Sequence, residues 1–446
     1  MKERTNMKKT IFNFLLIYLL TAILSCQSQP VTIPPPTTKQ PAPLPVINDS
    51  LFKGLPTHLI KWVLYSGNAG RLNTWGEKYP NSNTINYAFF GGKIYLHARK
   101  DRINLEEVKR NSKVTFVIDR FTDQLTLNTT KQGVWFSVNV FGTAKIIADP
   151  GLTAELANKY AIAVNTTPDK VEESVAAAEL DSQTKEMMKT IANRMVIVEI
   201  TPALITAKLN GEKLNLPKLP YTLDGTLFKP LTQEEEQSTA GLAQATYQPV
   251  SDLPRSGKPN TKLSLPPAQI DHILHSSSVG RIVTFGPVPM LSGEEYPYSV
   301  PVSFSYFEGK IALHGRAIGM KMDNIKNNPN VTFTVDRYNE KEGWVSINIF
   351  GEVEIIQDPV KKMETLMKYG TAYISPAAEI EPKVAEIKGP FQPMNMPLTL
   401  LVIHPKEITH RVSPVPAGMM TKQPYISDAT QVPKPDLPKT EGPHSK

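Results

Sequence analysis

The residues best suited to chemistry are Gly319, Met320 and Lys321, which stand where a predicted strand gives way to the amino terminus of a predicted helix. A phosphate dianion is held by a fixed cation together with free backbone N–H groups, and a lysine in the first turn of a helix can supply both. The spacing therefore indicates a phosphate site. A lysine on a helix surface is also commonly just solvated, so the residues alone leave both interpretations open.

A histidine recurs at a matched position, His97 and His314, near the end of a predicted strand. Such an imidazole could ligate haem iron. Alternatively, it could be a packing and hydrogen-bonding residue that two related segments of the chain have inherited. The sequence has neither HExxH nor CxxC spacing and contains one cysteine, so we predict no metal site. The recurring pairs Asp119-Arg120 and Asp336-Arg337 are interpreted as structural.

The single cysteine, Cys26, follows a basic segment and a mostly apolar run, Ile11 to Leu24, that is too short to span a bilayer. The stretch from Ile23 to Cys26 resembles the lipobox of bacterial lipoproteins, whose cysteine is acylated after cleavage. The resemblance implies a membrane anchor at Cys26, and Gln27 then favours the outer membrane of a bacterial cell envelope over the inner one. The alternative is an ordinary secretory peptide with an incidental cysteine.

The candidate residues belong to a duplicated segment. Ile94 to Arg120 and Ile311 to Arg337 align without a gap and are identical at 11 of 27 positions. After a shift of eight residues the match resumes, pairing Trp135 with Trp344 and continuing to Pro150 and Pro359. A period above 200 residues indicates a duplicated domain and excludes solenoids and propellers, whose repeats are shorter.

Composition and charge fit two globular domains with polar extensions. The chain has 446 residues, 40% hydrophobic and 20% charged. We predict a signal peptide at 1–25, a proline-rich stalk at 26–50, repeat 1 at 51–215, a linker at 216–262, repeat 2 at 263–412 and a disordered tail at 413–446. Removing the four basic and one acidic residues of the signal peptide lowers the net charge from +7 to about +4. Without a clustered basic face, we predict no nucleic-acid partner.

Alternating patterns predict that each repeat is mainly β with flanking helices. In repeat 2 we expect strands at 298–307, 310–314, 331–335, 344–356 and 398–404, a short helix at 320–328 and a helical region at 359–388. The short helix should end before Pro329, because the residue preceding a proline avoids helical dihedrals. A small closed or partly closed barrel would satisfy the strand edges.

Four segments of repeat 2 together resemble the pyridoxamine 5'-phosphate oxidase-like superfamily, nearest to its nitroimidazole-resistance-type branch. They are GRIVTFG from Gly280, YPYSVPVSFSYFEGKIALHG from Tyr296, GMKMDNIKNNPNVTF from Gly319 and SINIFGEVEIIQDP from Ser346. The resemblance implies two tandem six-stranded split β-barrels that form an intrachain pseudo-dimer or pair with another molecule. It also implies flavin mononucleotide (FMN) in a cleft at their interface.

Carried onto this chain, the resemblance assigns the flavin phosphate to Lys321 with Gly319 and Met320. The flavin-lining positions that it implies are Ser299, Val300, Pro301, His314, Gly315 and Ser346. Together with the lipobox-like segment, it implies a lipid-anchored oxidoreductase acting on a small planar substrate, with no catalytic residue assigned. Enzyme activity stays open, because flavin and reduced nicotinamide are scarce outside the cytoplasm. The alternative is a non-catalytic or haem-binding lipoprotein that uses the same cleft.

The two copies differ where the site is expected. Opposite Gly319 and Lys321, repeat 1 has Arg102 and Asn104, and opposite Val300-Pro301 it has Asn83-Thr84. Because the phosphate lysine is missing from repeat 1, we predict one working cleft in repeat 2 and a degenerate copy retained for its interface.

Overall fold

The structure is a computed structural model of the chain. It describes residues 49–55, 57–66, 69–99, 105–121, 135–180, 186, 195–210, 221–222, 227–228, 255–257, 265–277, 279–339, 343–375, 377–393 and 399–413. The predicted signal peptide, Cys26, the stalk up to residue 48, most of the linker, nearly all of the tail, and Arg102 and Asn104 lie outside these residues. Within the described ranges, no helix combines the length and apolarity needed to cross a membrane.

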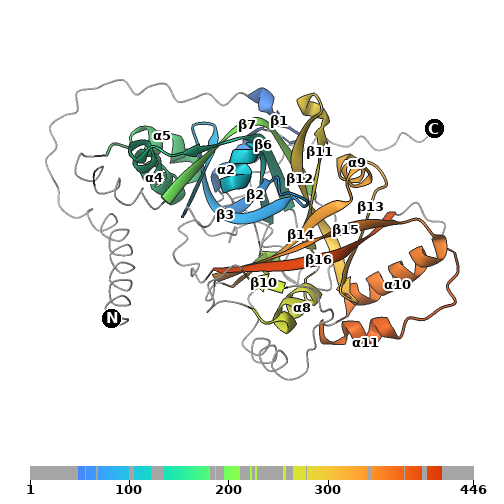
Figure 1. The fold of residues 1–446 in the computed structure, drawn as a ribbon. Coiled ribbons are helices and arrows are strands. Elements are labelled where there is room, and N and C mark those ends of the chain that lie inside the picture. Colours follow the sequence, from blue (N-terminus) through green and yellow to red (C-terminus); the bar gives the residue numbers. More distant parts are fainter. Residues whose placement is uncertain are drawn as a thin grey trace, which may run out of the picture. The chain divides into compact units, whose positions relative to one another are not determined.

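Repeat 1 forms a closed barrel in which neighbouring strands are antiparallel (Figure 1). Its strands are β2 (Ala69–Thr74), β3 (Asn81–Phe90), β4 (Lys93–Arg99), β5 (Lys113–Phe121), β6 (Trp135–Ile147) and β7 (Met195–Asn210). The order is β7-β4-β3-β2-β5-β6, and β6 pairs with β7 to close the ring. The short strand β1 (Phe52–Lys53) adds to β7 in parallel.

Repeat 2 forms a second barrel with the same order, β16-β13-β12-β11-β14-β15, closed by pairing of β15 with β16. Its strands are β11 (Val279–Val288), β12 (Glu294–Phe307), β13 (Lys310–Gly315), β14 (Asn330–Asn339), β15 (Gly343–Ile356) and β16 (Thr399–Ser413). Strand β10 (Arg255–Gly257), which falls within the predicted linker, pairs with β16 as β1 does with β7. A separate hairpin joins β8 (Tyr221–Thr222) and β9 (Leu227–Phe228).

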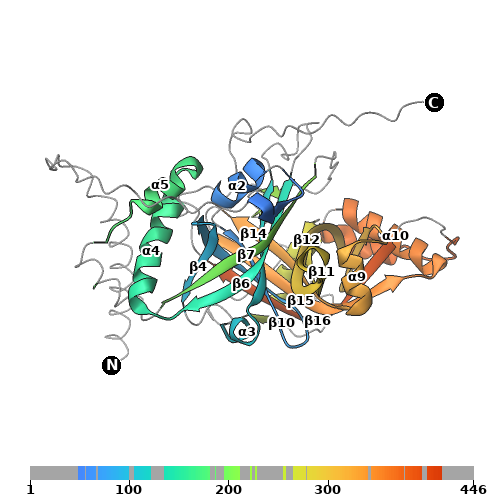
Figure 2. The ribbon, with the colours of Figure 1, turned by 90° about the horizontal axis from the view of Figure 1, so that it is seen from above.

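Helices flank each barrel. In repeat 1 they are η1 (Asp49–Leu51), α2 (Thr57–Ser66), α3 (Leu105–Arg110), α4 (Pro150–Asn165), η3 (Pro168–Lys170) and α5 (Val171–Ala176). In repeat 2 they are α8 (Pro267–His275), η4 (Pro289–Leu291), α9 (Met320–Asn327), α10 (Pro359–Ile374), η5 (Ala377–Glu379) and α11 (Ile380–Ala385). Figures 1 and 2 show α4 and α5 beside the first barrel and α10 beside the second, and Figure 1 also shows α11 there. Asp149 and Asp358 cap α4 and α10, with a proline in the first turn of each.

The two barrel interiors repeat the same aromatic pair. Tyr87 meets Phe116 edge to face with ring centroids 5.1 Å apart, and Phe304 meets Phe333 in the same way at 4.9 Å. All four side chains are buried. Burial of aromatic and branched aliphatic side chains supplies the main free energy that holds each barrel together.

A glycine at matched positions lets the two longest strands of each barrel bend past each other. The register shifts at Phe141/Gly142 and at Phe350/Gly351. A Cβ on Gly142 would lie 2.4 Å from the Thr201 carbonyl oxygen, and one on Gly351 would lie 2.5 Å from that of His404. Only glycine permits this close approach at a β-bulge.

The predicted fold class, two tandem six-stranded barrels that are mainly β, is confirmed. The predicted elements of repeat 2 are all present, but several bounds differ. Strand β12 begins four residues before the predicted start at Tyr298, and β16 runs nine residues past the predicted end at His404. The helical region 359–388 is divided into α10, η5 and α11. The prolines Pro297 and Pro405 obscured the alternation in these strands.

The barrels meet along a seam at which equivalent residues exchange contacts. Arg71 Nε donates to Asp336 Oδ2 at 2.8 Å, and its counterpart Arg281 Nε donates to Asp119 Oδ2 at 2.7 Å. The hydroxyls of Thr115 and Thr332 donate to the carbonyl oxygens of Pro297 and Pro80, respectively. Reciprocal contacts of this kind are the signature of a two-fold interface, here between two halves of one chain.

Aromatic stacking and buried charge fix how the halves meet. Trp75 and Phe285, each four residues after its seam arginine, stack with centroids 4.4 Å apart and planes 7° from parallel. Burial alone would raise the pKa of Asp336, but the charges of Arg71 and Arg281 outweigh it and hold the pKa below its ordinary value. The Asp-Arg repeat interpreted as structural therefore contributes its two aspartates to the centre of the seam.

Candidate functional site

Lys321 lies in the first turn of α9, as predicted. The helix begins after Gly319, whose φ of 107° is a conformation that side-chain-bearing residues rarely adopt, and no side chain caps the helix. Lys321 is half-buried, and its pKa is lowered first by burial and then by the charge of Lys208. An ammonium held near the open end of a helix and beside a like charge is poised to bind an anion.

The second charge comes from repeat 1. Lys208, on β7, donates from Nζ to the Tyr298 hydroxyl of β12 at 3.0 Å, and the same Nζ lies 5.8 Å from the centroid of the Tyr298 ring. In the described part of the chain, neither Lys208 nor Lys321 forms an ion pair with a carboxylate. The site therefore combines residues of both repeats.

The end of β13 lies next to Lys321. A Cβ on Gly315 would come within 3.1 Å of Lys321 Nζ, so the glycine leaves room for the ammonium. The His314 side chain is exposed, and its ring meets Tyr369 of α10 edge to face at 5.2 Å. One side of the ring packs against Tyr369, and this partial burial, followed by the charge of Lys321, lowers the pKa of His314. The imidazole is therefore neutral near pH 7.

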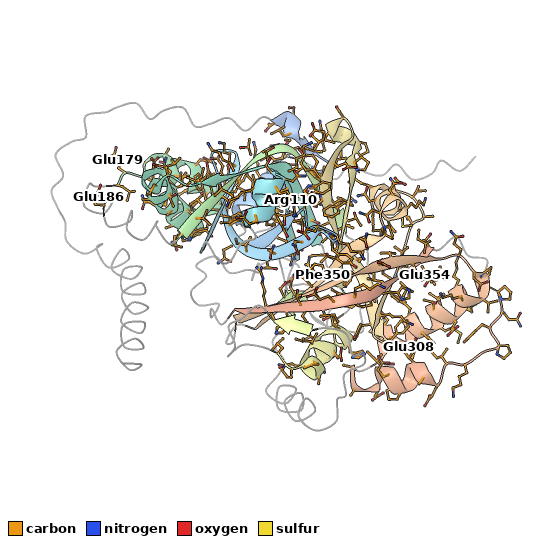
Figure 3. All side chains as sticks on the ribbon, viewed as in Figure 1. Arg110, Glu179, Glu186, Glu308, Phe350 and Glu354 are labelled. Atoms are coloured by element: carbon orange, nitrogen blue, oxygen red, sulfur yellow. The ribbon has the colours of Figure 1, made fainter. Side chains whose placement is uncertain are left out.

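An apolar cluster at the seam adjoins these charges. Its buried members are Phe141 and Leu204 of repeat 1 and Val288, Tyr296 and Tyr298 of repeat 2, with Leu291, Val300 and Met320 packed against them. Phe141 meets Tyr296 edge to face at 5.7 Å. The matched pair on the other side of the seam is Phe350, labelled in Figure 3, with Tyr79 at 5.9 Å. Val300 and Met320, two of the positions that the resemblance implied for the flavin, thus pack against this cluster.

The remaining implied positions lie along the strands. Ser299 is buried opposite Val283, and within the described residues its hydroxyl has no hydrogen-bond partner. Pro301 lies opposite Arg281. Ser346 lies opposite Asp336, and its Oγ is 3.5 Å from the Thr84 hydroxyl of repeat 1. No contact in the described residues joins Ser346 to Lys321. Ser346 also lies opposite Arg411, just as its counterpart Ser137 lies opposite Lys208.

Lys208, Tyr298, Phe141 and Leu204 were not singled out from the sequence. Lys208 and Leu204 lie near the end of repeat 1, where nothing local distinguishes them from ordinary strand residues. Their relevance depends on β7 facing the second barrel, which no periodicity reveals. The described residues contain no group of three or more histidine, cysteine, aspartate or glutamate side chains arranged to hold a metal.

The family model described as pyridoxamine 5'-phosphate oxidase matches residues 60–208 and again residues 266–411, about two thirds of the chain. The chain belongs to the pyridoxamine 5'-phosphate oxidase family. No curated protein sequence matches it significantly. The two matched ranges correspond to the two barrels, so each barrel is one copy of the family's domain.

Solved structures that match are remote. A FAD-binding protein from Mesorhizobium loti is 18% identical, covering 33% of this chain and 92% of its own, with a TM-score of 0.24. A candidate 5-nitroimidazole antibiotic resistance protein from Bacteroides thetaiotaomicron is 12% identical, covering 34% and 84%, with a TM-score of 0.25. A flavocytochrome from Azotobacter vinelandii is 12% identical, covering 36% and 69%, with a TM-score of 0.26.

Proposed function

We propose that this family member binds FMN through its phosphate at Lys321, in the cleft between the two barrels. The observation that carries the proposal is that both lysines lie at the seam cluster, Lys208 on Tyr298 and Lys321 directly after Met320, without a carboxylate partner in the described residues. Bringing two ammoniums together raises the free energy of the empty site, and a phosphate dianion between them would remove that cost.

The residues around the two lysines fit a flavin nucleotide. The lysines and the amino end of α9 match the phosphate, and the aromatic members of the seam cluster match an apolar ring system. Bound flavin would supply hydride or electron transfer to a small planar substrate. The chain's own residues would hold the phosphate, position the nucleotide and limit access of water.

The test of the proposal is the visible spectrum of the full chain after incubation with FMN and removal of free flavin. Wild type should retain flavin absorption, and Lys321→Ala should abolish it. The matched control is Asn104→Ala, at the corresponding position of repeat 1, which should change little. Equal losses at both positions would refute the single-cleft assignment, and no retained flavin in wild type would refute the proposal itself.

A haem-binding function is the second candidate, because His314 carries an exposed imidazole that stays neutral near pH 7. A neutral imidazole is the form that ligates haem iron. If haem is the ligand, the purified chain should show a Soret band that His314→Ala removes. The corresponding change at His97 should leave that band in place.

We also propose that the chain is exported and anchored to the bacterial outer membrane through acylated Cys26. The support is the basic and apolar segment that precedes this single cysteine. Metabolic labelling with a fatty acid should mark wild type, whereas Cys26→Ser should lose both the label and the membrane association. Labelling of the Cys26→Ser variant would contradict the anchor.

A further inference from the structure

We infer that Lys208 of repeat 1 is the second cation of the Lys321 site, so that a phosphate monoester is held between one lysine from each repeat. This inference rests on the proposed function and names a residue and a ligand class for the same site. It makes each barrel incomplete as a binding unit without the other.

The position of Lys208 is fixed from the opposite barrel. Its Nζ hydrogen-bonds to the Tyr298 hydroxyl at 3.0 Å, and the Tyr298 side chain is 4% exposed within the seam cluster. The ammonium is thereby held at the cluster that Met320, the neighbour of Lys321, also contacts, and its charge lowers the pKa of Lys321. Since Tyr298 is a neutral partner, the charge of Lys208 remains available to an anion.

Several other lysines of the described residues pair with a carboxylate. Lys159 lies 2.7 Å from Glu155, and Lys361 and Lys383 each lie 2.5 Å from a glutamate. Such pairs neutralise surface charge at small net free energy. Lys208 and Lys321 instead concentrate two positive charges beside an apolar cluster, which is the arrangement expected of an anion site.

The other side of the seam carries different residues at the matched positions. Sheet register pairs Phe141 with Leu204 and, equivalently, Phe350 with Glu407. The repeat alignment places Glu107 where repeat 2 has Asn324. Glu107 accepts a hydrogen bond from Thr74, whereas Asn324 donates one to Thr284, the counterpart of Thr74. Two carboxylates therefore stand where the Lys321 side has neutral side chains, although the position matching Lys208 keeps a cation, Arg411.

Two further substitutions in repeat 1 disfavour an anion. Ala98 stands at the position of Gly315, and Asn104 stands at the position of Lys321. Gly315 leaves room for the Lys321 ammonium, and repeat 1 keeps neither the glycine nor the lysine. With two added carboxylates and no counterpart of Lys321, Arg411 alone should not hold a dianion on that side, so one phosphate monoester should bind per chain.

The charge of the ligand follows from the two lysines. A phosphate monoester carries about −1.5 to −2 at pH 7, which two ammoniums can balance. Riboflavin has the same ring system without phosphate and should not depend on Lys208. Inorganic phosphate shares the anionic group without the ring, so it probes the two lysines independently of flavin.

The experiment compares FMN and riboflavin binding to the full chain by fluorescence titration. Lys208→Gln keeps a hydrogen-bond donor near Tyr298 but removes the charge, and it should weaken FMN about tenfold or more without changing riboflavin binding. Lys208→Arg should retain most of the FMN affinity. Lys145→Gln and Lys326→Gln remove exposed lysines from β6 and from the end of α9, and neither should change it.

Failure of this inference is distinguishable from failure of the proposed function. If wild type binds FMN and Lys208→Gln binds it equally well, the role of Lys208 is overturned while FMN binding stands. If wild type binds no FMN, the proposed function fails. In that case ³¹P NMR with inorganic phosphate tests the two-lysine site on its own. Phosphate binding that Lys208→Gln removes would support the two-lysine site, and no phosphate binding would overturn it.

Discussion

The matched histidines of the two repeats, His97 and His314, lie in different surroundings. His97 of repeat 1 is partly buried against Tyr160 with ring centroids 5.4 Å apart, and burial lowers its pKa to about 4. His314 is exposed and lies beside Lys321. The same inherited residue is therefore a packing group in repeat 1 and part of a charged site in repeat 2.

His97 should make the fold sensitive to acid. The unfolded chain protonates this imidazole near pH 6.5, whereas the folded chain resists until about pH 4. The free energy of unfolding should therefore fall as the pH drops through this window, by at most about 1.4 kcal/mol per pH unit for one such group. Urea unfolding at pH 7 and pH 5 should show a smaller acid loss in His97→Gln than in wild type.

The acid loss should be reduced rather than removed, because the pKa values of His314 and His410 are also lowered by burial. Lys145→Gln should keep the full wild-type loss. An acid loss in His97→Gln equal to that of wild type would contradict burial as the cause.

From the sequence alone, only one of the two lysines of the candidate site was predicted. Lys321 was predictable because a glycine, a lysine and a helix start are local features of the sequence. Lys208 was not, because its contact with Tyr298 joins residues 90 positions apart. Ser346 illustrates the same limit, since its structural neighbour Thr84 belongs to the other repeat.

Among the elements, β13 and α9 position Lys321, and Gly315 makes their junction possible. Gly315→Ala would place a methyl group 3.1 Å from Lys321 Nζ, the movable end of a long side chain. We therefore expect FMN affinity to fall, while the free energy of unfolding changes by about 1 kcal/mol or less. Fluorescence titration and urea unfolding measure the two effects separately.

Gly370→Ala is the matched control, because nothing lies within 4 Å of a Cβ at this position in α10. It should leave FMN binding unchanged and raise stability by about 0.5 to 1 kcal/mol, since alanine favours a helix over glycine. An FMN affinity of Gly315→Ala equal to that of Gly370→Ala would show that the space beside Lys321 has no role.

The strands illustrate what local patterns can and cannot define. Alternation and turn residues located the β12–β13 hairpin, where Glu308 and Gly309 adopt positive φ. Glu308, labelled in Figure 3, also pairs with Lys368 of α10 at 2.7 Å. The longer extents of β12 and β16 escaped prediction, because the ends of these strands are stabilised by pairing across the barrel rather than by local pattern.

For the whole molecule, the buried charges at the seam decide how the two barrels meet. Arg71→Met would leave Asp119 and Asp336 buried with one arginine in place of two. Removing one partner of a buried ionic group typically costs about 3 to 5 kcal/mol. Urea unfolding of the full chain should show a loss of that order.

Lys78→Gln provides the control at the same seam. Lys78 and Glu352 join the two repeats at 3.2 Å but are both exposed, so the loss of stability should be much smaller than that of Arg71→Met. Comparable losses in Arg71→Met and Lys78→Gln would contradict the structural role of the buried group.

The duplication was evident from sequence, and so was the barrel class, since both depend on patterns that recur along the chain. The reciprocal contacts between equivalent residues of the two barrels were not evident from the sequence. Arg71 and Arg281 are each fully buried, yet in the sequence they follow a glycine in an ordinary strand. Their partners were noticed only as repeated Asp-Arg pairs. Which side of a strand faces another domain depends on packing over distances that a sequence pattern does not record.

The most direct test of a single nucleotide cleft between two unequal barrels is the number of FMN molecules bound per full chain at saturation. Equilibrium dialysis with flavin absorbance gives this number. We predict one FMN per chain in wild type and none in Lys321→Ala. Two FMN molecules per chain, or one that persists in Lys321→Ala, would contradict a single FMN site at Lys321.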